Sequence, residues 1–189
     1  FDSMDYNVVY AQMGRGKNER NVAFALAGIA GTVSKLAFDA CMFNSQNFGF
    51  VKLPDECTTG SSIMPHKKNP DVFELIRARC NKLQALPQQI TLIMNNLPCG
   101  YFRDLQEIKE VFLPAFDQLI DCLQMATYIV GRMRVNEHIL DDPRYDLMFS
   151  VEEVNRLAAD GMPFRDAYRK VGLDIEAGRF SPCKEIRHT

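Results

Sequence analysis

Apolar residues recur along three stretches of the chain at alternating spacings of four and three, which is the rhythm of one apolar face on an α-helix. The first stripe comprises Val22, Leu26, Ile29, Val33, Leu36, Ala40 and Phe43. The second, with one charged interruption, comprises Val72, Ile76, Arg79, Leu83, Leu86, Ile90 and Ile93. The third comprises Phe112, Phe116, Leu119, Leu123, Ala126, Val130 and Met133. Each stripe predicts a helix of roughly 24 residues, about 36 Å long, in a left-handed bundle.

Two prolines fall within these stripes. Pro87 lies inside the second and predicts a kink, whereas Pro114 lies in the first turns of the third, where a proline is better tolerated. Arg79, on the apolar face, is expected either to meet an acidic partner or to extend to solvent.

The long apolar stripes end at about residue 134. Short helical patterns follow near 148–160 and 163–171, and no stretch shows sustained strand alternation. The sequence therefore predicts an all-α fold. Residues 1–134 are expected to form part of a long-helix bundle that carries a mobile loop, and residues 135–189 a small helical C-terminal cap domain.

Composition and charge argue against nucleic-acid-binding and membrane-spanning classes of protein. The net charge of −2 gives no basic surplus for nucleic acid, and no run of apolar residues is long enough to predict a membrane span. The start of the chain has neither an initiator Met nor a signal-peptide layout, so we expect a cytoplasmic protein whose sequence begins in mid-chain. The six cysteines form no CxxC pair and are expected to be reduced, buried thiols. The three histidines share no ligand spacing, which argues against a metal site.

A polar loop at residues 59–70 separates the first two stripes. It contains Ser61 and Ser62, then Lys67 and Asn69. A serine here could be a nucleophile, a base or a simple loop residue, and the lysine and asparagine could reach one carboxylate together. The alternative is a polar surface turn with solvated lysines.

Residues 60–70, Gly-Ser-Ser-Ile-Met-Pro-His-Lys-Lys-Asn-Pro, resemble the third signature block of the fumarase/aspartase superfamily. Its members eliminate fumarate from succinyl-bearing substrates. Residues 101–110, Tyr-Phe-Arg-Asp-Leu-Gln-Glu-Ile-Lys-Glu, resemble a pattern of the argininosuccinate lyase family at a matching distance, and residues 161–167 resemble its C-terminal domain. The resemblance covers nearly the entire chain, as the C-terminal portion of such a lyase. His66 keeps the adenylosuccinate lyases open as an alternative.

The resemblance implies roles for the loop. Ser61 matches the general base that removes the Cβ proton of the succinyl group, and Lys67 and Asn69 match groups that stabilise the aci-carboxylate. Glu74 matches the carboxylate that pairs with the family's histidine, and Ser62 is expected to support the loop and bind a carboxylate. The reaction needs no cofactor.

The second segment is implied to bind substrate through Tyr101, Gln106 and Lys109. Two departures lie among these residues, because Phe102 replaces the usual Asn and Ile108 the usual Asp. They indicate either an altered or acylated substrate or neutral drift.

Two further expectations concern the whole protein. The superfamily's first two signature blocks, one of which holds the histidine, have no match in these residues, so the chain alone is expected to be inactive. The family builds its site from three subunits, and the long stripes favour a homotetramer. A non-catalytic, crystallin-like helical protein is the alternative from another function class.

Overall fold

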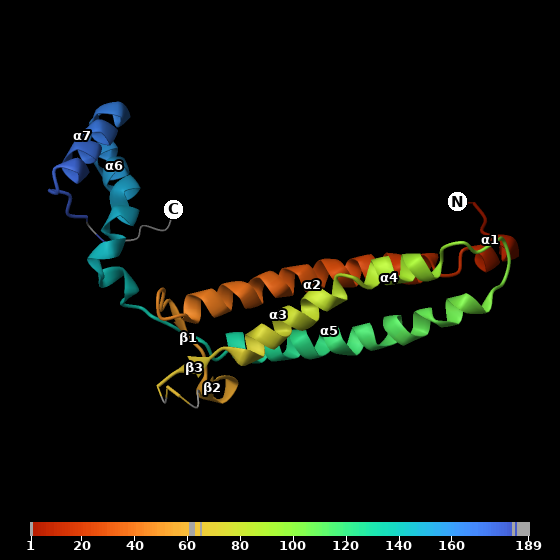
Figure 1. Ribbon diagram of the computed structural model, residues 1–189. Helices are drawn as coiled ribbons and strands as arrows, with labels where there is room; N and C mark the ends of the chain where they lie inside the picture. The colour runs from red at the N-terminus through yellow and green to blue at the C-terminus, as the bar shows by residue number, and fades with distance from the viewer. Residues whose placement is uncertain (1, 61–62, 65, 183, 185–189) are drawn as a thin grey trace. The chain divides into compact units, whose positions relative to one another are not determined.

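The computed structural model describes residues 2–60, 63–64, 66–182 and 184. The chain forms two compact units, Phe1–Val135 and Asn136–Thr189. The first unit contains three long helical layers (Figure 1), and helix α2 packs against the other two along its length. The helices are α1 (Val8–Met13), α2 (Lys17–Asn44), α3 (Asp71–Leu83), α4 (Leu86–Ile93) and α5 (Ile108–Val130). The prediction of an all-α bundle is confirmed.

Helix α2 begins after Gly16, whose φ of 82° lies in the left-handed region that glycine tolerates. Its predicted stripe is only half buried. Leu26, Val33 and Ala40 face the core, as expected. The remaining buried positions of α2 are small residues, Ala23, Ala30, Ser34 and Ala37.

The large residues between these positions remain exposed. Val22, Ile29 and Leu36 are 40%, 45% and 43% exposed. Within this chain the core of α2 is formed instead by short alanine side chains, which let the backbones of α2 and α3 approach closely. That the exposed half of the stripe meets a partner subunit stays a prediction.

The second stripe forms two helices rather than one kinked helix. Helix α3 ends at Leu83 and α4 begins at Leu86, so Pro87 occupies the first turn of a new helix. A proline is tolerated there because the N–H that it lacks would have no intrahelical partner. Arg79 is exposed, in agreement with the solvent alternative. The buried side chains of these helices are Phe73, Ile76, Cys80, Leu83, Leu86, Pro87 and Ile90.

The third stripe forms α5, which contains Pro114. Two-residue strands close the end of the bundle where α5 finishes. Strand β1 (Val51–Lys52) pairs antiparallel with β4 (Arg134–Val135), and β2 (Thr59–Gly60) pairs antiparallel with β3 (Lys68–Asn69). Short 3-10 helices lie at η1 (Asp55–Cys57) and η2 (Arg103–Gln106).

The second unit is built from two 3-10 helices, η3 (Ile139–Asp141) and η4 (Pro143–Phe149), followed by α6 (Ser150–Ala159) and α7 (Phe164–Glu176). Gly161, with φ of 97°, makes the turn between α6 and α7. The small core of this unit consists of Val154, Ala167 and Val171, with Leu157, Met162, Ile175 and Phe180 packed against it.

By length and composition alone, α2 could also cross a membrane, and it is the one helix of the described residues that meets this test. A mostly buried core helix of a soluble protein meets the same test; 28% of the tested window of α2 is buried, and α2 contributes residues to the hydrophobic core of the bundle.

The described cysteines are all free thiols. Cys57, Cys80 and Cys122 are buried as predicted, Cys41 is half-buried, and Cys99 is exposed, contrary to expectation. Cys183 lies outside the described residues.

Candidate functional site

The polar run between α2 and α3 folds as a hairpin. Thr59 pairs with Asn69 and Gly60 with Lys68, so residues 61–67 form the connection between β2 and β3. The Lys67 N–H donates to the carbonyl of Met64 at 3.0 Å. Ser61 and Ser62, predicted as base and carboxylate-binding group, lie outside the described residues, and their roles stay predictions.

Two side-chain contacts hold the base of the hairpin. The Thr59 hydroxyl donates to the carboxylate of Asp71, the first residue of α3, and Lys68 forms an ion pair with Asp55 in η1. The hydrogen bond from Lys68 lowers the pKa of Asp55 below its ordinary value, with smaller contributions from neighbouring cations. Sequence analysis missed the Lys68–Asp55 pair, because the two residues become neighbours only when the hairpin closes.

The other residues predicted for this end of the bundle gather around the hairpin. Asn69 is half-buried in β3, whereas Lys67 and Glu74 are exposed. Glu74 lies in the first turn of α3, where a carboxylate interacts favourably with the helix dipole, and its N–H donates to the carbonyl of Pro70 at 3.1 Å. An ammonium group and an amide donor therefore lie within two residues of each other in the chain, and the carboxylate of Glu74 follows in the first turn of α3. This arrangement suits the binding of an anionic substrate.

The second predicted group lies just before and within the start of α5. The Gln106 amide donates to the Tyr101 hydroxyl at 3.1 Å, and the guanidinium carbon of Arg15 lies 4.5 Å from the centre of the Tyr101 ring. Hydrogen bonds from Arg15, chiefly, and from Gln106 lower the pKa of Tyr101. Lys109, exposed in the first turn of α5, adds a smaller electrostatic contribution. Sequence analysis did not identify Arg15, since no local pattern links it to Tyr101.

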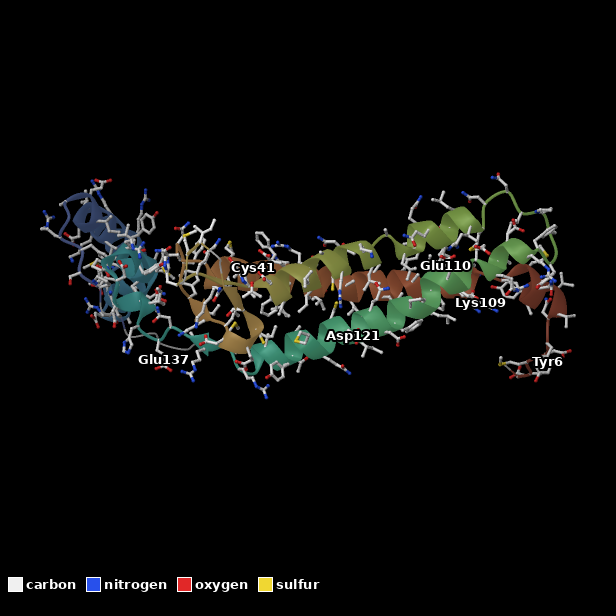
Figure 2. The ribbon with its side chains drawn as sticks, turned by 60° about the horizontal axis from the view of Figure 1, so that its bottom comes forward. Tyr6, Cys41, Lys109, Glu110, Asp121 and Glu137 are labelled. Carbon is white, nitrogen blue, oxygen red and sulfur yellow. The ribbon has the colours of Figure 1, made fainter. Side chains whose placement is uncertain are left out.

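The two groups lie at opposite ends of the bundle. Strands β2 and β3 lie beside the C-terminal end of α5 in Figure 1, whereas Lys109 lies at the far end of that helix in Figure 2. Helix α5 has 23 residues, which corresponds to about 34 Å. One copy of the chain thus does not bring Lys67, Asn69 and Glu74 together with Tyr101, Gln106 and Lys109.

The two departures from the family pattern differ in their surroundings. Ile108 is 3% exposed and belongs to the hydrophobic core of the bundle, whereas Phe102 is half-buried. The isoleucine at position 108, where the family pattern has Asp, therefore contributes to helix packing in this chain. Phe102 directly precedes η2, next to Tyr101 in the chain.

Within the part of the chain that the structure describes, no cluster of three or more histidine, cysteine, aspartate or glutamate side chains could hold a metal ion.

Comparison with known proteins places these residues in context. A protein-family model described as "Lyase" matches residues 18–85, which include all but the first residue of α2, the hairpin and α3. The chain is 82% identical over all 189 residues to an argininosuccinate lyase of Phocaeicola vulgatus, of which it covers 42%. It thus spans about two fifths of the length of the curated relatives that it matches.

Solved structures with the same fold include a cobalt-bound fumarate lyase:delta crystallin of Brucella melitensis, with a TM-score of 0.74 and 21% identity over 94% of this chain and 38% of that one. An EDDS lyase variant with bound fumarate has a TM-score of 0.72 and 21% identity, over 94% of this chain and 36% of the other. At these identities the two structures show a shared fold.

Proposed function

Since the chain belongs to the argininosuccinate lyase family of the fumarase/aspartase superfamily, as a segment of such a lyase, we propose that the intact protein eliminates fumarate from argininosuccinate to release arginine. The observation that carries the proposal is the 82% identity to an argininosuccinate lyase along all 189 residues, which include both groups of candidate residues. The proposed setting is arginine biosynthesis in the cytoplasm.

The proposed mechanism begins with Ser61 removing a proton from the Cβ atom of the succinyl group. The electron pair left on carbon delocalises into the adjacent carboxylate and gives a dianionic aci-carboxylate. Lys67 and Asn69 stabilise this species, because a cation and a donor gain most where negative charge develops. The electrons then form the double bond of fumarate as the bond between Cα and nitrogen breaks. The nitrogen leaves with the bonding pair and takes up a proton, which balances the one removed from Cβ and gives arginine. Ser62 binds a carboxylate of the substrate.

The remaining residues are proposed to orient partners in the reaction. Glu74 pairs with the family's histidine, which this chain lacks at a matching position. Tyr101, Gln106 and Lys109 bind substrate from a different copy of the chain, because about 34 Å of helix separates them from the hairpin within one copy. The intact protein is therefore proposed to be a homotetramer with composite sites, and the 189-residue chain alone is proposed to be inactive.

The test is fumarate release by the intact protein, supplied with argininosuccinate and adenylosuccinate in parallel. We expect turnover of argininosuccinate and a fall of several orders of magnitude on Ser61→Ala, because the base is lost. Ser181→Ala removes a hydroxyl from an exposed position of the second unit and is the matched control.

Other results would change the proposal in specific ways. Turnover of adenylosuccinate alone would indicate an adenylosuccinate lyase instead. No turnover of either substrate by the intact protein would support the non-catalytic, crystallin-like alternative. Full activity of Ser61→Ala would assign the base to another residue. Fumarate release by the isolated chain at the rate of the intact protein would refute its proposed inactivity.

A further inference from the structure

A charged cavity lies at the end of the bundle where β1 and β4 pair. Its volume is about 420 Å³, and its charged lining residues are Lys52, Asp55, Glu56, Arg132 and Arg134. We propose that this cavity binds a small, multiply charged anion, either a phosphate group or a dicarboxylate, at a site separate from the residues assigned to fumarate elimination.

The strand pairing places two cations directly opposite each other. In the antiparallel ladder of β1 and β4, Lys52 is in register with Arg134. Like charges in this position destabilise a pair of strands. No acidic side chain among the described residues lies within ion-pair distance of either one. An anion bound between them would remove the repulsion.

The acidic residues of the lining have other partners. Asp55 forms its ion pair with Lys68 of the hairpin, and Lys52 and Arg134 act on it only as weaker, more distant charges. The Tyr128 hydroxyl donates to the carboxylate of Glu56 at 3.4 Å. The cavity therefore keeps a surplus of positive charge.

The third cation is held in place before any ligand binds. The guanidinium carbon of Arg132 lies 3.8 Å from the centre of the Tyr128 ring, and its Nη1 donates to the Tyr128 carbonyl at 3.3 Å. Stacking on an aromatic face leaves the other N–H groups of a guanidinium available, and their planar arrangement matches the oxygens of a phosphate or a carboxylate. A cavity of this size fits a small molecule.

The experiment is titration calorimetry of the intact protein with inorganic phosphate and, separately, with succinate, in chloride buffer of matched ionic strength. We expect binding that Lys52→Gln/Arg134→Gln weakens at least about tenfold, because two charged contacts are lost. Lys35→Gln/Lys82→Gln removes the same charge from exposed bundle positions and should bind as the wild type does. The two titrations distinguish a phosphate site from a carboxylate site.

A second variant keeps the test decisive if the double variant folds poorly. Arg134→Glu places opposite charges across the ladder, so it should raise the melting temperature in phosphate-free buffer and abolish the stabilisation by added anion. Equal anion binding by wild type and Lys52→Gln/Arg134→Gln, or an effect that chloride reproduces, would overturn the proposal. Binding is measured without turnover, and argininosuccinate activity should persist in these variants, so failure here is distinguishable from failure of the proposed lyase function.

Discussion

At the residue scale, the environment of Tyr101 is the clearest case in which neighbours change the chemistry of a predicted site residue. The guanidinium of Arg15 lies over its ring and is the chief cause of its lowered pKa, and Gln106 donates to its hydroxyl. Both contacts stabilise the phenolate more than the phenol, which lowers the pKa of Tyr101. A phenol tuned in this way donates a stronger hydrogen bond to an anionic substrate.

The first prediction concerns that pKa. Arg15→Gln should raise the pKa of Tyr101, because the largest stabilising contact of the phenolate is removed. The measurement is a phenolate absorbance titration of the intact protein, with the curve of Tyr101→Phe subtracted. Lys17→Gln is the control, since it removes a cation that lies 5.2 Å from the ring of Tyr10 instead. An unchanged Tyr101 titration in Arg15→Gln would contradict the assignment.

The second prediction concerns the buried thiols. Burial and the neighbouring thiol of Cys122 raise the pKa of Cys80 to about 12. At pH 8 only ~10⁻⁴ of Cys80 is then thiolate, the reactive form. In the folded protein, iodoacetamide should label the exposed Cys99 and spare Cys80, as read by peptide mass spectrometry.

Denatured protein is the control for this labelling, because both cysteines should react once the core is exposed. Native labelling of Cys80 as fast as Cys99 would show that the packing between α3 and α5 opens readily.

At the element scale, periodicity predicted the three helical layers but not the orientation of each face. Along α2, the stripe with larger side chains includes Ile29 and Leu36, yet the alanines beside them face the core. Hydropathy ranks the larger residues as more apolar, whereas close helix packing in this chain selects the smaller ones. A sequence pattern does not distinguish the face that meets the same chain from the face left for another.

The hairpin of β2 and β3 could not be predicted either, because strands of two residues carry no alternation to detect.

The third prediction tests the anchor of this hairpin, which is the ion pair between Lys68 and Asp55. Asp55→Asn should speed amide hydrogen exchange in β2 and β3, since the ion pair with Lys68 is lost. The melting temperature should stay unchanged, because exposed ion pairs contribute little to global stability.

The sign of the pH dependence follows from the lowered pKa of Asp55. The anchor is present above the ordinary carboxyl pKa and is lost as pH falls through the lower folded value. Asp117→Asn, an exposed charge change on α5, is the control. Unchanged exchange in Asp55→Asn would show that the Thr59–Asp71 contact suffices.

At the scale of the whole molecule, the bundle leaves many large apolar side chains uncovered. Those on α2 and α5 include Phe24, Phe38, Leu113 and Ile120, which are 62%, 50%, 58% and 47% exposed. Exposed apolar surface along long helices is typical of bundles shared between subunits. The same assembly would bring a hairpin of one copy to the Tyr101 end of another. From the sequence, a site shared between subunits was expected only through the family resemblance, and the helix order of the structure now gives it a physical reason.

The last prediction follows from that separation. Ser61→Ala and Lys109→Ala should each inactivate the intact protein, but subunits of the two variants mixed after reversible dissociation should regain activity. In a site built from two copies, one subunit then supplies an intact hairpin and another an intact Tyr101 segment, so about a quarter of the sites are restored by random mixing.

Fumarate release by the mixture is the measurement, and a mixture of Ser61→Ala with Lys67→Ala is the matched control. Both of those changes lie in the same hairpin, and no combination of their subunits supplies an intact one. Equal inactivity of the two mixtures, with mixed tetramers verified by mass spectrometry, would show that each site draws both groups from one copy, which about 34 Å of α5 forbids in this structure.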